Sequence, residues 1–292
     1  MSEPDQAMTD DERAGPSRDL GTMSVGPVLF VSGIYLILEI GTSLAVARNS
    51  HSSPIATISS GVLTIEIIVA AMEIGLVVAL LAMERVHPAA AGIRFGKMPS
   101  GLLLGFVVWG LSQLLMATVA LARHGSFSLY LGWAEPAAMF APLLEHFLTD
   151  VFAEEIFWRG VFFLWIIRSL EKRSWGSPLA RLGAGLVGSQ LLFGISKLPS
   201  HILDPTTPAI PPGGALLVFT VSGMFYALIY LRTANLWLVM AIHSLTLWPV
   251  PLFAFDLDPS RLTVLVAAVL LIPIGQSIYT LRSGKGRSAG EV

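Results

Sequence analysis

Two adjacent glutamates and an arginine lie in an otherwise apolar stretch, DVFAEEIFWRGVFF, at residues 150–163. Ionisable side chains in such surroundings are costly, so each is expected to face a partner or a cavity. Residues four apart on a helix are neighbours, and Glu155 is therefore expected to pair with Arg159. Glu154 points about 100° away from Glu155 on a helix. It is left without a local partner and is expected to face a cavity.

Acidic side chains outnumber basic ones within the apolar runs of this chain. The only bases in or near these runs are Arg159 and Lys197, with His146 and His243 besides. The acids cannot all be ionised in a low dielectric against two fixed cations, so protons or a bound cation must neutralise some of them. This excess indicates a wet or functional interior. Three of these acids, Glu39, Glu66 and Glu73, are nevertheless expected mainly to hold neighbouring helices together. The seven acids are Glu39, Glu66, Glu73, Glu145, Asp150, Glu154 and Glu155.

Three segments follow one another in an order that resembles a known family. EEIFWRG begins at residue 154, QLLFGISKLPS covers 190–200, and FTVSGMFYALIYLRTANLWLVMAIHSL covers 219–245. They resemble the EExxxR motif, the FxxxH segment and the closing histidine helix of the CPBP family, which includes type II CAAX prenyl proteases, bacteriocin-processing proteins and Abi proteins. The resemblance covers about residues 85–255. It implies a multi-helix intramembrane endopeptidase that cuts hydrophobic or prenylated peptides.

The resemblance also implies roles for individual side chains. Glu154 matches the glutamate that activates a water molecule, with Glu155 and Arg159 as its companions. His243 matches the last histidine of the family. If the family's reaction operates here, Glu154 takes a proton from water and His243 assists.

Two positions depart from the family pattern. Lys197 stands where the FxxxH histidine is expected, and Leu247 stands where an asparagine is expected to hold the oxyanion. A protonated lysine has no lone pair, so it cannot replace histidine as a base or metal ligand. It would attract Glu154 and make it a weaker base. The alternative that keeps Lys197 catalytic is that desolvation removes its proton, so that it acts as a base itself. Leu247 donates no hydrogen bond, and one oxyanion donor is typically worth about 10²–10³ in rate.

A zinc ion is the metal to consider, because the chain has no cysteine and any ligands must be His, Asp or Glu. Catalytic zinc usually has three protein ligands. Glu154 and His243 supply two, and His201 supplies the third if it bends inward. Pro199 lies between Lys197 and His201 and weakens the helix that would carry it there.

The composition predicts the fold class. Hydrophobic residues make up 54% of the 292 residues and charged residues only 13%, about half the charged share of a soluble domain, which is about 25%. A helix needs about 20 apolar residues to cross a bilayer. We expect an all-α, polytopic transmembrane bundle of about eight spans with a CPBP/Abi-like core. The fourth run is too long for one straight span, so it is expected to start in the membrane interface or to be broken near Asp150. The expected runs are 26–47, 60–83, 100–122, 137–168, 182–197, 214–231, 235–254 and 261–281.

The remaining organisation follows from polarity and charge. Residues 1–22 are expected to form a disordered acidic tail, 23–284 one membrane domain with its family-like core at about 85–255, and 285–292 a second tail. Thirteen of the 18 Lys and Arg residues fall on the side that holds both termini, and four on the other. Because cytoplasmic loops carry more Lys and Arg, both termini are expected in the cytoplasm.

Three hypotheses for function remain open. The first is an intramembrane endopeptidase, and the second is a catalytically silent relative that holds a lipid, a peptide or a partner membrane protein, with Glu154 and Lys197 as a structural clasp. The third is transport or proton movement through the acidic interior. The acid-rich spans fit it, but the sequence shows no inverted repeat and no paired broken helices, which many transporters have. The expected partners are membrane lipids and a hydrophobic or lipidated peptide or membrane protein, and no nucleic acid.

Overall fold

The computed structural model describes residues 20, 23–49, 65–126, 128–203, 210–254 and 259–270. Except for residue 20, both predicted tails lie outside the described residues, and so does the side chain of Glu66. The described residues are mainly helical and form no strand, and isolated bridges such as that between Leu129 and Phe253 are their β-structure. The all-α prediction is confirmed.

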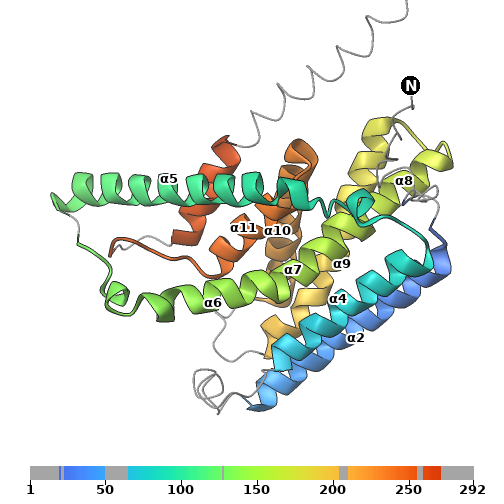
Figure 1. Cartoon of the computed structure of the whole chain (residues 1–292), viewed down its shortest axis with the longest axis horizontal. Coiled ribbons are helices and arrows are strands. Elements are labelled where there is room, and N and C mark those ends of the chain that lie inside the picture. The colour runs from blue at the N-terminus through green and yellow to red at the C-terminus, as the bar shows by residue number, and fades with distance from the viewer. Residues whose placement is uncertain are drawn as a thin grey trace, which may run out of the picture.

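The helices follow the predicted apolar runs closely (Figure 1). The long helices are α2 (Val25–Asn49), α4 (Ile65–Met83), α5 (Met98–His124), α9 (Pro178–Leu203) and α10 (Pro212–Thr233). The shorter helices are α6 (Pro136–Leu148), α7 (Asp150–Glu154), α8 (Leu164–Lys172) and α11 (Leu236–Leu247), with a further helix at Pro259–Leu270. Short 3-10 turns η2 (Pro88–Ala91), η3 (Phe95–Lys97) and η4 (Leu131–Ala134) join them.

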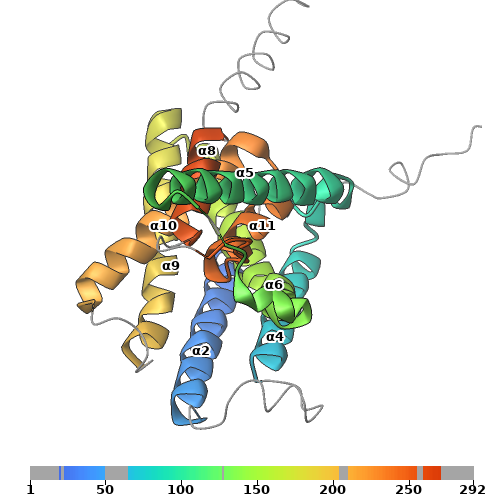
Figure 2. The ribbon, with the colours of Figure 1, turned by 90° about the vertical axis from the view of Figure 1, so that its left-hand side faces the viewer.

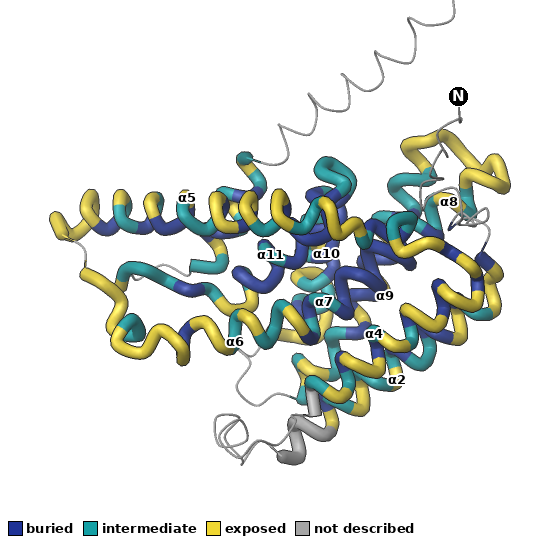
Figure 3. The backbone as a smooth tube through the Cα atoms, viewed as in Figure 1, coloured by how far each residue is buried: buried dark blue, intermediate teal, exposed yellow. Residues whose placement is uncertain are grey.

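Four stretches are long and apolar enough to cross a membrane: Val25–Leu44, Phe95–His124, Pro178–Leu203 and Pro212–Thr233. Three shorter apolar helices accompany them at Ile67–Met83, Leu236–Leu247 and Pro259–Leu270. Large apolar side chains remain exposed along these helices, as the yellow outer side of α5 shows (Figure 3). This is the surface of an integral membrane protein in contact with lipid. The count of eight spans stays a prediction.

The fourth apolar run is divided near Asp150, as predicted. α6 ends at Leu148, and Thr149 leaves the helical region with φ −108° and ψ −99°. The carbonyl oxygen of Glu145 accepts from the backbone amide of Thr149 at 2.9 Å and also from the Thr149 hydroxyl at 2.7 Å. α7 then begins at Asp150.

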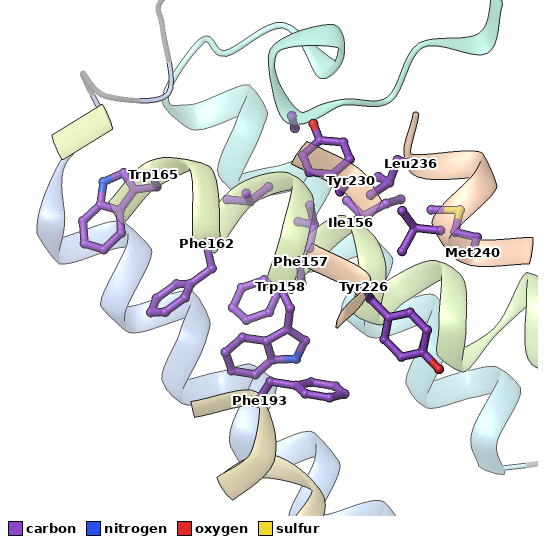
Figure 4. Packing of buried hydrophobic residues seen from close by; sticks show 14 of the residues in the cluster. Ile156, Phe157, Trp158, Phe162, Trp165, Phe193, Tyr226, Tyr230, Leu236 and Met240 are labelled. Atoms are coloured by element: carbon purple, nitrogen blue, oxygen red, sulfur yellow. The ribbon is translucent and has the colours of Figure 1, made fainter. Parts of the chain in front are cut away.

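The glutamate-arginine motif continues into a π-helical segment, η5 (Glu155–Phe163), every residue of which is buried. Its aromatic side chains form much of the core with Phe193 of α9 and Tyr226 of α10 (Figure 4). Gly160 lies against the η2 turn, where an added Cβ would come 2.4 Å from the carbonyl oxygen of Ala91. Only glycine fits this approach. π-Helical turns are rare and often occur at functional sites.

Three helix contacts bring the motif segments together. α9 packs against both α2 and α10, and α5 lies across α11 in both views (Figures 1 and 2). α11 begins at Asn235, whose side chain accepts a hydrogen bond from the amide of Leu238. α7 and η5 contact α4, α9 and α11. The three motif segments therefore meet in the middle of the bundle.

Candidate functional site

Lys197 of α9 lies between two carboxylates from different helices. Its Nζ lies 2.5 Å from Glu154 Oε1 on α7 and 2.8 Å from Glu39 Oε1 on α2. All three side chains are largely buried: the exposed fraction is 19% for Lys197, 5% for Glu154 and 13% for Glu39. An ammonium group donates to both oxygens and accepts nothing. The attraction of Lys197 for Glu154 that the sequence predicted is therefore present, and Glu154, which was expected to face a cavity, has its partner on another helix.

Glu155 is the centre of a second buried cluster. Its Oε1 lies 3.0 Å from the Arg159 guanidinium on η5 and 2.6 Å from Nδ1 of His243 on α11. Both Glu155 and Arg159 are fully buried. The local pair with Arg159 is the one that the four-residue spacing predicted. Because Glu155 accepts from Nδ1, the neutral imidazole keeps its lone pair on Nε2.

Aromatic rings enclose this second cluster. The guanidinium carbon of Arg159 lies 4.2 Å from the ring centroid of Phe193 and 5.5 Å from that of Tyr226. Tyr226 also stacks on His243 with a centroid distance of 4.3 Å. These contacts place a cation over aromatic faces and fix the plane of the imidazole. Tyr226 was not predicted from the sequence, because an aromatic residue in an apolar helix gives no signal of such a role.

The two adjacent glutamates therefore belong to separate clusters. Within the described residues, no hydrogen bond or ion pair joins Glu154 to His243, and each instead has its own partner on another helix. The sequence predicted that Glu154 and His243 would act together. The structure brings each of them to the centre of the bundle but assigns His243 to Glu155.

The neighbouring hydroxyl groups do not replace the two missing family groups. Ser196 donates to the carbonyl oxygen of Phe193 at 2.7 Å. Thr246 donates to the carbonyl oxygen of His243 at 2.7 Å, and its oxygen lies 2.5 Å from the Tyr226 hydroxyl. Both hydroxyls are engaged within the protein.

Leu247, at the end of α11, lines an apolar cavity of ≈ 440 Å³ together with Trp248 and Met116. A neighbouring cavity of ≈ 370 Å³ shares Trp248 with it and extends along α6. Glu154, Lys197 and His243 line neither cavity. The position at which the resemblance predicted an oxyanion donor thus lines a hollow with mainly apolar side chains around it.

The residues present do not fit a catalytic zinc ion. Oε1 of Glu154 already accepts from an ammonium group, and an ammonium cannot ligate a metal. α9 continues through Pro199 to Leu203, although the proline was expected to weaken the helix there. His201 nevertheless does not join the other two expected ligands, because its Nε2 lies 2.9 Å from the carbonyl oxygen of Ile210. Across the part of the chain that the structure describes, no group of three or more His, Asp or Glu side chains can hold a metal.

Glu39 joins two helices, as the sequence predicted, but its contact with the site was not predicted. It was expected to hold neighbouring helices together, and it does join α2 to α9, but through the lysine that also contacts Glu154. The available signal was the excess of acids over bases in the apolar runs. A lysine among apolar helices that carry more acids than bases is expected to contact more than one carboxylate.

Residues 136–248 match the family model described as type II CAAX prenyl endopeptidase Rce1-like. The matched segment lies within the region predicted to resemble that family, and it contains Glu154, Lys197 and His243. The match confirms the predicted resemblance for this part of the chain. No curated protein and no solved structure matches the chain.

Proposed function

We propose that this integral membrane protein is a relative of the type II CAAX endopeptidases that holds a hydrophobic or lipidated peptide segment without cleaving it. Its membrane-embedded site keeps the family's glutamates, arginine and last histidine. It has a lysine and a leucine at two further positions where the family has polar working groups. Binding, rather than hydrolysis, is the activity that these side chains support best.

The contact between Lys197 and Glu154 carries this proposal. To activate water, a carboxylate must accept a proton from it, and this requires a lone pair that is directed at the water. The ammonium group of Lys197 donates to that same carboxylate at 2.5 Å. That oxygen of Glu154 is thereby occupied by an ammonium hydrogen in place of a water hydrogen.

Leu247 supports the binding half of the proposal. A leucine cannot donate to a developing oxyanion, but its apolar side chain extends the wall of the ≈ 440 Å³ cavity. Apolar hollows of this kind bind by removing hydrocarbon from water or lipid contact and by close packing. An apolar side chain or a lipid group on a peptide is the matching occupant.

Peptide hydrolysis is the second candidate function, and the geometry of His243 favours it. Nδ1 of His243 is held by Glu155, which leaves Nε2 as an acceptor in a fixed orientation. The same arrangement of a buried acid behind a histidine serves general-base chemistry in many enzymes. For hydrolysis to proceed, Lys197 must release Glu154.

A cleavage assay separates the two candidates. The protein is reconstituted in vesicles with prenylated and unprenylated peptides, and the wild type is compared with Glu154→Ala and with the double variant Lys197→His and Leu247→Asn. We expect no cleavage by the wild type and measurable cleavage by the double variant. Cleavage by the wild type that disappears in Glu154→Ala would establish hydrolysis and overturn the proposal.

A binding assay tests the other half. A photoreactive residue replaces Leu247, and the crosslinked fraction is measured for a prenylated peptide and for its unprenylated match. The proposal predicts preferential capture of the prenylated form. A photoreactive residue at Val187, which is exposed on α9, serves as the matched control for general lipid contact. Equal capture at both positions would contradict a binding site at Leu247.

A further inference from the structure

Glu39 lies outside the segment that matches the family, yet it contacts the lysine at the centre of the site. It is on α2, whereas the matched residues begin at 136. α2 packs along α9 and α4 (Figure 2). The Glu39 carboxylate lies 2.8 Å from Nζ of Lys197, and the same nitrogen lies 2.5 Å from Oε1 of Glu154. A helix outside the matched core therefore contributes a charged group to the site.

We propose that Glu39 is a positioning residue that holds Lys197 on Glu154, so that α2 maintains the contact that blocks Glu154. This inference rests on the proposed function, because it explains how the blocking contact is maintained. Glu39 touches no substrate in this role. It acts through the ammonium group of Lys197.

The physical basis is the flexibility of the lysine side chain. Lysine carries a compact charge on a four-carbon stem and adopts many rotamers. A single carboxylate leaves the other ammonium hydrogens to find partners elsewhere, and a buried charge that lacks hydrogen bonds is costly. Two carboxylates from helices on different sides define the position of the nitrogen between them. Glu39 thus converts a mobile group into a fixed one.

Tyr35, one turn before Glu39, keeps α2 in the required place. Its ring stacks on Phe157 of η5 with a centroid distance of 4.4 Å and an interplanar angle of 8°. It is fully buried and packs against Trp158 as well. This contact fixes α2 against the segment that follows Glu154. The spacing of four residues then directs Glu39 toward the same side of α2.

Other charged groups surround the lysine without replacing Glu39. Glu73 of α4 is buried and lies within electrostatic range of Glu39, Lys197 and Glu154. Asp150 of α7 lies within the same range. Glu39 and Glu154 are the two carboxylates in direct contact with the ammonium group. Removing the lysine would therefore leave these two facing each other.

A thermal-unfolding cycle tests this arrangement in vesicles of one fixed lipid composition. Lys197→Met leaves Glu39 and Glu154 without their shared cation, and we expect the unfolding midpoint to fall by about 5–10 °C. Glu39→Gln should lower the midpoint in the wild type, because Lys197 loses a partner. In the Lys197→Met background the same change should raise it, because one of two facing carboxylates is removed.

This reversal of sign identifies the role of Glu39. Glu135→Gln is the matched control, because Glu135 is exposed and its side chain caps no helix; it should have the same effect in both backgrounds. If Glu39→Gln lowers the midpoint equally in both backgrounds, Glu39 does not act through Lys197 and the inference is overturned. Glu154→Gln is measured in the same cycle. If only Glu154→Gln shows the reversal of sign, the proposed function stands and the inference about Glu39 is overturned. If Glu154→Gln shows no reversal, the contact between Lys197 and Glu154 is not stabilising, and the proposed function and this inference are both overturned.

A site-resolved reaction provides a readout that packing alone would not change. Hydrophobic carbodiimides modify protonated carboxyl groups, and mass spectrometry identifies the modified residue. Glu39 should be unmodified in the wild type and at least tenfold more modified in Lys197→Met, because two facing carboxyls must share a proton. Lys197→Arg retains the cation and should restore protection. Equal modification of Glu39 in all three proteins would overturn the inference.

Discussion

Glu154 and Glu155 are adjacent in the sequence, yet they bind partners on different helices. Glu155 contacts Arg159 four residues later, and this contact follows from helix spacing alone. Its contact with His243 and the pairing of Glu154 with Lys197 join residues 88 and 43 positions apart, respectively. Local spacing could therefore predict one of these three contacts. The others depend on how the helices pack, which no local pattern specifies.

Removing the carboxylate of Glu155 should destabilise the protein strongly. Glu155→Ala leaves the fully buried Arg159 guanidinium without its counter-charge. Breaking a buried pair in this way costs about 3–5 kcal/mol. Denaturant unfolding in a mild detergent measures the loss.

The control is Glu171→Ala, which breaks the exposed pair between Arg168 and Glu171. Exposed pairs are worth about 0–1 kcal/mol. Similar losses for Glu171→Ala and Glu155→Ala would show that the Glu155 cluster does not behave as a buried ion pair.

At the scale of elements, the length of the fourth apolar run correctly predicted its division near Asp150. The sequence did not predict that the motif itself would be π-helical. A π-helical turn depends on the packing around it, here against η2, α9 and α11. The wider turn differs little from an α-helix in residue pattern. This is why the spacing still paired Glu155 with Arg159.

The close approach of η5 to η2 gives a prediction for Gly160. Gly160→Ala places a Cβ 2.4 Å from the carbonyl oxygen of Ala91, so the backbone must shift. Overpacking of this kind costs about 1–3 kcal/mol. The unfolding free energy of the variant in detergent measures the effect.

Gly188→Ala on α9 is the matched control, because its added Cβ meets nothing within 4 Å. A helical alanine in open space is about 0.5–1 kcal/mol more favourable than glycine. The two changes should therefore have opposite signs. Stabilisation by Gly160→Ala would show that η5 and η2 are not in contact in the membrane.

At the scale of the whole molecule, apolar helices surround a small charged centre. Composition predicted this bundle because a chain with 54% hydrophobic and 13% charged residues cannot cover itself with polar surface. Four of the described stretches reach spanning length. The order of the three motif segments predicted which helices meet. The contribution of α2 to the site was not predicted, since α2 lies outside the matched segment.

The orientation predicted from Lys and Arg placement is testable with single cysteines, because the chain has none. Lys172→Cys and Ser126→Cys are exposed positions predicted to lie on opposite sides of the membrane. A membrane-impermeant thiol reagent applied to intact cells should label Ser126→Cys alone. It should label Lys172→Cys only after the membrane is opened. The reverse pattern would invert the predicted topology.

The charge state of Glu154 tests the central claim most directly. If Lys197 holds Glu154 as a carboxylate, a hydrophobic carbodiimide should leave Glu154 unmodified in wild-type protein within vesicles. In Lys197→Met, Glu154 should become modified at least tenfold more, because its paired cation is gone and it competes with Glu39 for a proton. Wild-type protein in which Glu154 is modified as readily as in Lys197→Met would contradict the account.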